Sequence, residues 1–396
     1  MSETTALAPE TLCNHIAPIL LSDDNYPLSM PIYQSVKFSV KNFDELKKIF
    51  RGERAGYFYT RHGNPTVHQL EMLLAQLQGT EAGWATATGV AAITGTLLSL
   101  LKSGDRLIYF IESYRPSRVF AEHTLKNLGI KLSRLSMRDH EGIKAALALP
   151  DAKVILFESM SNPQLQAPPL DLIVTEARRH GVCTILDNTF AGFQGFQDAP
   201  VDLYIHSLTK FASGHGDVMG GIVLGDRKHI EHISETMVHL GATLDPHAAY
   251  LILRGMKTYH LRRRQQVANA QELALWLQRH PKVEAVQYPG LHEHPQHATF
   301  ASRYQDFGSM LLVTLKNKKV SLEQIVTEGR LFKLAASLGS TESLITPALF
   351  FFGGDLSESE RVAAGLDGSA IRLSIGIEDV ADLKADLKQL LARVPD

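Results

Sequence analysis

The chain has 396 residues, of which 44% are hydrophobic and 21% charged, with a formal net charge of −2 at pH 7. This length predicts two large domains, and the near-neutral charge offers no field that would attract nucleic acid or an anionic membrane. The two cysteines, Cys13 and Cys183, exclude a disulfide framework and a four-cysteine zinc site. Residues 1–20 lack the features of a secretory signal, and no run of about 20 apolar residues could span a bilayer. We therefore expect a cytoplasmic protein that acts on small molecules.

Residues 1–60 are rich in Pro, Ser, Tyr and Asn with weak periodicity, which predicts an extended arm that contacts a neighbouring subunit. Short apolar runs then alternate with amphipathic stretches, which predicts a cofactor-binding domain over 61–258. Because these runs are continuously apolar, we expect strands buried on both faces of a mostly parallel α/β sheet. The predicted strands are 84–87, 106–110, 153–157, 184–186, 203–205 and 221–224.

The first two of these strands are followed by residues suited to an anion and to an aromatic ring. Thr88 and Gly89 open a predicted helix over 91–101, and backbone N–H groups at a helix start bind anions such as phosphate. Tyr114 follows the strand that ends at Phe110 and could cover the face of a bound ring.

Polar residues cluster where the next strands end, at 158–162, 187–189 and 207–210. Ligands of open α/β sheets bind beyond the carboxyl ends of the strands. Lys210 lies in the third cluster, between the hydroxyls of Ser207 and Thr209 and a glycine-rich turn. A lysine with an ordinary pKa of about 10.4 attacks carbonyls only after that pKa is lowered, so Lys210 is a candidate Schiff-base nucleophile if it is buried.

Pyridoxal 5′-phosphate requires a lysine, an acid that keeps its ring nitrogen protonated, donors for its phosphate and an aromatic face. Lys210 and Asp187 fit the first two roles, because a nearby carboxylate favours a pyridinium. The helix start at Thr88 and the two hydroxyls beside Lys210 fit the third, and Tyr114 fits the fourth. We therefore expect this cofactor.

A basic stretch over 261–278 predicts a helix at the start of a smaller α+β domain. We expect this domain to cover 259–396 and to contain strands at 309–314 and 371–375. Arg372 places a guanidinium among apolar residues, where a bidentate anion such as a substrate carboxylate is the natural partner.

Two other patterns are not expected to bind a ligand. The histidine-rich segment 292–297 contains a proline and lacks a completing Cys or Asp, so we expect a solvated loop without a metal ion. The run Arg262-Arg263-Arg264 predicts a solvated or interface helix face, because a single short cluster in a near-neutral chain is weak evidence for nucleic-acid contact.

These features together resemble the Cys/Met-metabolism family of pyridoxal-phosphate enzymes over nearly the whole chain. The matching segments are 31–35, 59–66, 187–190, 206–210, 253–258, 337–339 and 371–379. The resemblance implies an aspartate-aminotransferase-like α/β fold of type I, an amino-acid substrate, and an active site shared between the subunits of a dimer or a dimer of dimers.

The resemblance also implies a role for each matching residue. Lys210 would bind the cofactor covalently and move the proton, and Tyr114 would stack on the ring and take part in catalysis. The other cofactor contacts would be Asp187, Thr189, Thr88, Gly89, Val90, Asn162, Ser207, Thr209 and, from the neighbouring subunit, Tyr59 and Arg61. The substrate would be bound by Arg372, Ser337, Leu338 and Tyr59.

Within the family, the resemblance implies a carbon–sulfur lyase with cystathionine β-lyase activity. The segment Tyr114-Arg115-Pro116-Ser117 resembles the form typical of bacterial β-lyases, and Ala336 stands where γ-enzymes usually have glutamate. Leu338 and Val119 differ from residues often found in β-lyases. A γ-elimination or γ-replacement enzyme of the same family, and a catalytically silent ligand-binding homologue, are the alternatives. A nicotinamide-binding enzyme is disfavoured, because no Gly-x-Gly-x-x-Gly follows a predicted strand.

Overall fold

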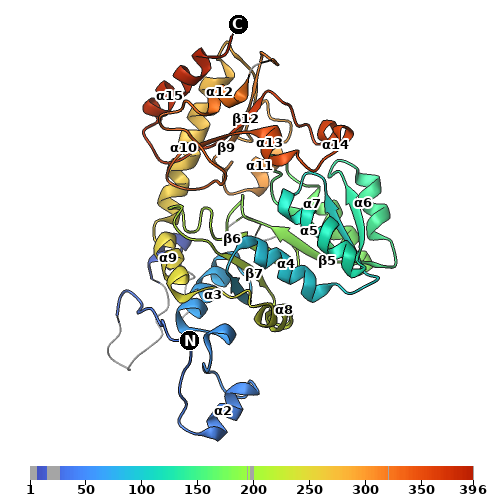
Figure 1. The fold of residues 1–396 in the computed structure, drawn as a ribbon, viewed down its shortest axis with the longest axis vertical. Coiled ribbons are helices and arrows are strands. Elements are labelled where there is room, and N and C mark those ends of the chain that lie inside the picture. Colours follow the sequence, from blue (N-terminus) through green and yellow to red (C-terminus); the bar gives the residue numbers. More distant parts are fainter. Residues whose placement is uncertain (1–6, 16–26, 194, 197–199, 320, 396) are drawn as a thin grey trace.

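The computed structural model describes residues 7–15, 27–193, 195–196, 200–319 and 321–395. Residues 1–6 and 16–26, which belong to the predicted arm and to the segment expected not to be a secretory signal, lie outside the described residues. The strands of these described residues form one sheet of seven and one of five (Figure 1). No helix in the described part of the chain is long and apolar enough to cross a membrane.

The seven-stranded sheet is mostly parallel. Its strands are β1 (Ala82–Thr86), β2 (Arg106–Phe110), β3 (Lys131–Leu135), β4 (Ala152–Glu158), β5 (Cys183–Asp187), β6 (Leu203–Ser207) and β7 (Gly221–Gly225), in the spatial order β1-β7-β6-β5-β4-β2-β3. The pairs from β3 to β6 are parallel, whereas β7 is antiparallel to both β6 and β1. The predicted α/β architecture is confirmed.

The apolar runs did not predict β3, which lies at the edge of this sheet. Its sequence, Lys-Leu-Ser-Arg-Leu, is too polar to form a continuous apolar run, and all five residues are at least partly exposed. An edge strand of this kind is covered less completely than a central one, so the signal used for the other strands is absent here.

Helices cover both faces of the large sheet. They are α3 (Pro65–Gln78), α4 (Gly89–Leu100), α5 (Arg115–Phe120), α6 (His140–Leu147), α7 (Leu170–His180), α8 (Arg227–Leu240) and α9 (Pro246–Met256), with a π-helical turn at Ala121–Leu125 and 3-10 turns at Thr60–His62 and Lys126–Leu128. In β2, Ile108 and Phe110 join one hydrophobic cluster while Leu107 and Tyr109 join another. Successive side chains of a strand point to opposite faces, so the sheet separates two cores.

The five-stranded sheet is mostly antiparallel and lies towards the C-terminal end of the molecule (Figure 1). Its strands are β8 (Val283–Gln287), β9 (Met310–Leu315), β10 (Lys333–Leu334), β11 (Leu344–Pro347) and β12 (Ala370–Ser374), in the order β10-β11-β12-β9-β8. The accompanying helices are α10 (Tyr259–Gln278), α11 (His297–Arg303), α12 (Leu322–Val326), α13 (Ala348–Phe352), α14 (Glu358–Ala363) and α15 (Val380–Ala392). The predicted strands at 309–314 and 371–375 are present as β9 and β12.

The arginine run in α10 is only in part the solvated or interface face that the sequence predicted. Arg262 donates to the backbone carbonyl oxygens of Phe211 and Gly255, at 2.9 and 2.8 Å, and Arg263 forms an ion pair with Asp306 at 2.6 Å. Both arginines are buried whereas Arg264 is exposed, so the prediction of a solvated face was wrong for Arg262 and Arg263. A charge run does not reveal which of its members finds buried acceptors on segments that are distant in the sequence.

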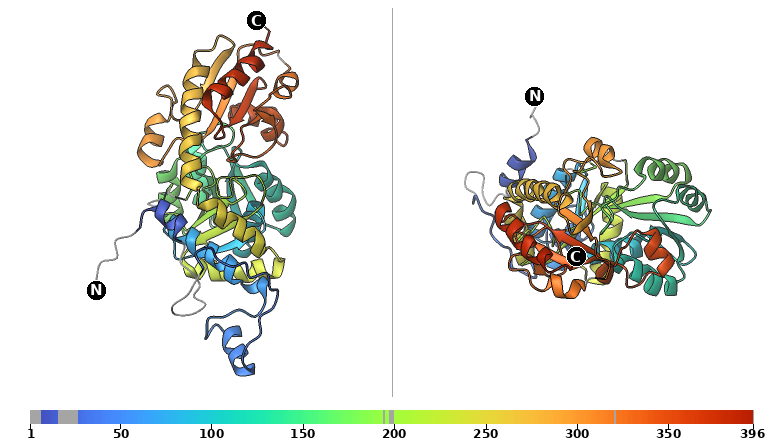
Figure 2. Two further views of the ribbon diagram at one scale, coloured as in Figure 1. Left: turned by 90° about the vertical axis from the view of Figure 1, so that its left-hand side faces the viewer. Right: turned by 90° about the horizontal axis from the view of Figure 1, so that it is seen from above.

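The described part of the arm contains α1 (Pro9–Asn14) and α2 (Phe43–Phe50). Helix α2 projects at the end of the molecule opposite the C-terminus, as Figures 1 and 2 show. Its apolar side chains Phe43 and Phe50 are 69% and 70% exposed.

Candidate active site

The carboxyl ends of β4, β5 and β6 lie side by side at one end of the large sheet. The strands are adjacent and parallel, and Glu158 at the end of β4 is paired in register with Asp187 at the end of β5. The backbone N–H of Ser207, at the end of β6, donates to the hydroxyl of Thr189 at 2.9 Å. The polar clusters predicted after three separate strands therefore meet in one place.

Asp187 is a partly buried carboxylate that forms no ion pair within the described part of the chain. Its Oδ1 accepts hydrogen bonds from the backbone N–H of Thr189 at 3.1 Å and from the Thr189 hydroxyl at 2.6 Å. Burial raises the pKa of Asp187, while these two hydrogen bonds lower it. A partly buried carboxylate is costly without a cationic partner, so Asp187 is suited to face a cationic group.

The start of α4 lies against the end of β6, and the N-terminus of a helix is suited to bind an anion. Thr88 caps the helix by accepting a backbone N–H of the first turn at 3.0 Å. A Cβ on Gly89 would lie 2.8 Å from the Cβ of Ser207, so a residue without a side chain lets the helix approach the loop after β6. The hydroxyl of Thr209 accepts the N–H of Gly220 at 3.1 Å, which holds that loop in place.

Lys210 and Arg372 meet at Ser337. The Nζ of Lys210 donates to the hydroxyl of Ser337 at 2.8 Å, and Nη2 of Arg372 donates to the backbone oxygen of Ser337 at 2.7 Å. Burial, and then the positive charge of Arg372, lower the pKa of Lys210 to about 8. An amine with this pKa is partly neutral near pH 7, as a nucleophile or a base must be.

Ser337 holds a backbone conformation that favours glycine. Its φ is 106°, and a non-glycine residue in this region is strained. The conformation brings the Ser337 hydroxyl to Lys210 and its carbonyl oxygen to Arg372. Strain of this kind is concentrated at functional sites, where the surrounding structure maintains it.

Arg372 is a buried guanidinium with an unused donor. It is 4% exposed, and its Nη1 donates to Asn162 Oδ1 at 3.3 Å. Among the described residues, its Nε has no acceptor and the ring of Phe352, 4.9 Å from the guanidinium carbon, is the aromatic group that it faces. Burial lowers the pKa of Arg372 to about 10. A buried cation with a free donor is complementary to a carboxylate.

Tyr114 borders the same space at the start of α5. Its backbone N–H donates to Oε1 of Glu158. Burial, followed by the charges of Asp187 and Glu158, raises the pKa of the Tyr114 hydroxyl. The side chain is 37% exposed, so part of the ring is open to a ligand.

Four of the predicted site residues have no described hydrogen bond with the polar cluster around Lys210. Arg61 donates to the backbone oxygen of Val238 at 3.5 Å and lies 5.6 Å from the ring of Tyr59, and no described contact joins either residue to Lys210. Val90 is exposed on the first turn of α4. Leu338 is buried in the hydrophobic cluster of the large sheet, so its side chain packs against protein.

Sequence reasoning gave no role to Glu158, Phe352 or the pair Arg118 and Asp355. The guanidinium of buried Arg118 binds the Asp355 carboxylate at 2.9 and 2.7 Å, which fastens α5 to the segment after α13. These two residues are 237 positions apart, so no local pattern connects them. Glu158 could have been found, because it is an acid at a strand end beside the strand of Asp187.

Comparison with known proteins agrees with this geometry. The model of the family "Cys/Met metabolism PLP-dependent enzyme" matches residues 21–392. The chain belongs to this family. It is 37% identical over 373 residues to an L-methionine γ-lyase of Pseudomonas putida, covering 93% of this chain and 94% of the relative. It is also 35% identical over 366 residues to a cystathionine β-lyase of Coxiella burnetii, covering 91% and 92% of the two chains.

A solved structure extends the likeness to the fold of the whole chain. The putative O-acetylhomoserine (thiol)-lyase of Campylobacter jejuni has a TM-score of 0.91 and 30% identity, covering 98% of this chain and 100% of the other. That structure contains N′-pyridoxyl-lysine-5′-monophosphate. The expected family, fold and pyridoxal-phosphate cofactor are thus confirmed for this trans-sulfuration enzyme.

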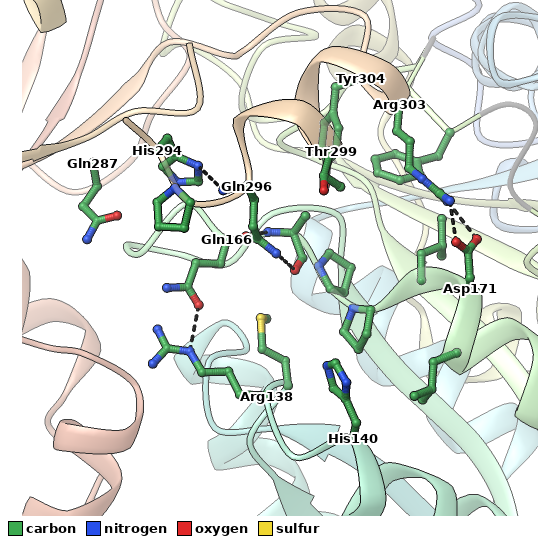
Figure 3. Close-up of a pocket in the computed structure, with 18 residues that line it drawn as sticks. Arg138, His140, Gln166, Asp171, Gln287, His294, Gln296, Thr299, Arg303 and Tyr304 are labelled. Carbon is green, nitrogen blue, oxygen red and sulfur yellow. Dashed lines mark hydrogen bonds and ion pairs between the residues drawn. The ribbon is translucent and has the colours of Figure 1, made fainter. Parts of the chain in front are cut away.

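A separate groove of about 790 Å³ lies between α11 and the segment 166–172, which includes the start of α7 (Figure 3). Some of its polar side chains are engaged with one another, as in the ion pair of Arg303 with Asp171 and the hydrogen bond from Arg138 to Gln166. His294 of the histidine-rich segment is buried against it, so that segment is not fully solvated as predicted. The described residues contain no group of three or more His, Cys, Asp or Glu that could hold a metal ion.

Proposed function

We propose that this enzyme cleaves a carbon–sulfur bond by β-elimination from cystathionine, giving homocysteine, pyruvate and ammonia. The observation that carries the proposal is the meeting of Lys210 and Arg372 at Ser337, at 2.8 and 2.7 Å. An amino-acid lyase needs a base for the Cα proton and a receptor for the carboxylate on that same carbon. These two side chains are close enough to act on one substrate.

The described residues fit pyridoxal phosphate. Asp187 lacks a cation and would pair with the ring nitrogen, while Thr189 holds its carboxylate and Tyr114 would cover the ring. The absent Cβ of Gly89 lets the start of α4 lie against Ser207, so the helix N-terminus and the Ser207 hydroxyl would both face the phosphate. The remaining contacts would be Thr88, Val90, Ser207 and Thr209 to the phosphate and Asn162 to the ring hydroxyl. When bound, the cofactor supplies an electron sink for the pair released at Cα.

The protein's own groups bind the substrate and move its protons. Arg372 would hold the α-carboxylate with its free Nε and an adjacent donor. Lys210, with its pKa lowered to about 8, would accept the Cα proton. The raised pKa of the Tyr114 hydroxyl keeps it protonated, so it can donate a hydrogen bond to the departing sulfur.

The β-reaction is preferred because γ-chemistry requires a second proton to be removed, from Cβ. Ala336, next to Ser337, offers no ionisable group where the γ-enzymes of the family usually have a glutamate. The segment 114–117 also has the form typical of bacterial β-lyases. γ-Elimination or γ-replacement is the second candidate, because the chain is 37% identical to an L-methionine γ-lyase.

The keto acids formed from a panel of substrates test this choice. Cystathionine, cysteine, methionine and O-succinylhomoserine are each assayed for pyruvate and for 2-oxobutyrate. We expect pyruvate from cystathionine and cysteine, because both carry sulfur on the β-carbon, and background rates from the other two. If 2-oxobutyrate is the only keto acid, the β-assignment is wrong. If none of the four substrates yields a keto acid, a catalytically silent homologue is supported.

We also propose that each active site is completed by a second subunit. Tyr59 and Arg61 have no described contact with Lys210 of their own chain, and the exposed Phe43 and Phe50 offer an apolar surface to another copy. Further proposals are the division into an arm (1–60), a cofactor-binding domain (61–258) and a C-terminal domain (259–396), assembly as a tetramer, and a cytoplasmic location.

Subunit complementation is expected between Arg61→Ala and Lys210→Ala. A mixed dimer contains one Arg61→Ala subunit and one Lys210→Ala subunit. If Arg61 acts in the active site of the partner subunit, one site of this dimer has both defects and the other has none. About half of the wild-type activity is then expected in a two-fold symmetric assembly. Co-expression with two different tags and tandem purification isolates the mixed dimers. Doubly tagged Lys210→Ala dimers are the inactive control. Mixed dimers without activity above this control would show that Arg61 does not act across the interface.

A further inference from the structure

Glu158 and Asp187 form a pair of carboxyl groups beside the start of α5. They are paired positions of the adjacent parallel strands β4 and β5, so their backbones are about 4.8 Å apart and their side chains share one face of the sheet. Glu158 is 9% exposed, and its Oε1 accepts the backbone N–H of Tyr114. The roles proposed above use Asp187 and Tyr114 but give none to Glu158.

The acids around Glu158 outweigh the cations. Asp187 of β5 and Glu112, just after β2, both act on it with negative charge. Glu112 is itself bound by the hydroxyl and the backbone N–H of the turn at 136–137, at 2.6 and 3.1 Å. Arg118 of α5 is the cation that acts on Glu158.

Arg118 is not available to pair with Glu158. A guanidinium has five N–H donors. In Arg118, two of these bind the carboxylate of Asp355, and the others bind the backbone oxygens of Ile111, Ser113 and Phe352. Glu158 is therefore left with a neutral donor, the backbone N–H of Tyr114, and no ion pair within the described chain.

One negative charge is the stable state of this pair. Burial, and then the charge of Asp187, raise the pKa of Glu158 to about 8. Two enclosed carboxylates without a cation do not both ionise cheaply, so one of them retains a proton. Asp187 accepts two hydrogen bonds from Thr189 that favour its ionised form. The proton is therefore held by Glu158.

We propose that Glu158 is a positioning residue that remains protonated at neutral pH, shares one negative charge with Asp187 and fixes the backbone of Tyr114. A neutral carboxyl group accepts the Tyr114 N–H through its carbonyl oxygen without placing a second charge beside the cofactor ring. Glu158 thus determines both the negative charge that faces the ring nitrogen of the cofactor and the position of the Tyr114 ring that stacks on it. These consequences rest on the roles proposed for Asp187 and Tyr114.

Charge sharing is tested on the apo-enzyme with Glu158→Gln, which keeps an acceptor for Tyr114 and cannot ionise. The pKa of Glu158 is about 8 in the folded chain against an ordinary value of 4.5. Such a group stabilises the fold fully below its unfolded pKa, and that contribution is lost as the pH rises through the folded pKa. The urea midpoint of the wild type is therefore expected to fall, relative to that of Glu158→Gln, between pH 5 and pH 8.

The same measurement in an Asp187→Asn background separates the effect of the Asp187 charge on the pKa of Glu158 from the effect of burial. Removing the charge of Asp187 is expected to weaken the pH dependence that distinguishes Glu158 from its glutamine variant, because one cause of the raised pKa is gone. A wild-type and Glu158→Gln difference that is constant from pH 5 to 9 overturns charge sharing. So does a pH dependence that Asp187→Asn leaves unchanged.

The positioning of Tyr114 is tested by cofactor affinity, measured as quenching of protein fluorescence when the apo-enzyme is titrated with pyridoxal phosphate. Glu158→Gln is expected to bind within about threefold of wild type, whereas Glu158→Leu, which leaves the Tyr114 N–H without an acceptor, binds about tenfold more weakly or worse. Equal weakening in the two variants contradicts this role. If Glu158→Leu does not fold, Glu158→Asp, which withdraws the acceptor by one methylene, takes its place.

These tests are independent of the proposed reaction, since they use no substrate. If cystathionine yields pyruvate but the urea midpoints of wild type and Glu158→Gln change in parallel with pH and the Glu158 variants bind the cofactor equally well, the β-assignment stands and the role of Glu158 is wrong. If only 2-oxobutyrate is formed but Glu158→Leu binds the cofactor more weakly than Glu158→Gln does, the positioning role stands and the β-assignment is wrong.

Discussion

Lys210→Ala is expected to lower product formation by about 10⁴-fold, because the variant lacks both the covalent attachment point and the general base. Lys210 is the amine at the strand ends whose pKa is lowered to about 8, and its Nζ is held 2.8 Å from the Ser337 hydroxyl. Borohydride reduction followed by peptide mapping is the direct measurement. The wild-type peptide that contains Lys210 is expected to carry the mass of the reduced cofactor, and the variant none.

The matched control is Lys153→Ala, which removes an exposed lysine from β4 of the same sheet. It is expected to keep the activity and the labelled peptide. Addition of a small amine such as methylamine is expected to restore part of the activity of Lys210→Ala, since a diffusible base replaces the missing one. Wild-type activity in Lys210→Ala, or a label on another lysine, would refute the assignment.

The large sheet could be predicted because its central strands are buried on both faces and appear as uninterrupted apolar runs. β3 escaped prediction because an edge strand has exposed positions that admit Lys, Ser and Arg. The burial of Arg262 and Arg263 escaped for a different reason. Their acceptors are backbone oxygens near 211 and 255 and the carboxylate of Asp306, and a charge run contains no information about such distant partners.

The residues of the candidate site also differ in how far the sequence could predict them. Asp187 and Lys210 were found from position, because each lies at or just beyond the end of a strand and parallel strands end together. Ser337 and Tyr59 were named only through family resemblance, since nothing local in the sequence marks a strained serine or a residue that has no contact with Lys210. Glu158 was visible as an acid at a strand end. Its lack of a cation partner becomes evident only when Arg118 is seen to be fully engaged.

Arg372→Leu is expected to raise the KM for cystathionine by about 10²-fold or more, because a buried charge-assisted contact is lost. The wild-type guanidinium is 4% exposed, and its Nε has no acceptor among the described residues, so it is desolvated before the substrate arrives. Arg372→Lys keeps the charge without the planar fork and is expected to fall between wild type and Arg372→Leu. Arg264→Ala, on the exposed face of α10, is the control and is expected to match wild type.

A comparison of cysteine with cysteamine separates a carboxylate receptor from a residue that only supports the fold. The two substrates differ by the α-carboxylate, so wild type is expected to prefer cysteine strongly and Arg372→Leu to lose most of that preference. A general loss of structure lowers activity on both substrates and leaves their ratio unchanged. An unchanged ratio would assign Arg372 to the support of Ser337 and Asn162, its present hydrogen-bond partners, and the substrate carboxylate would need another receptor.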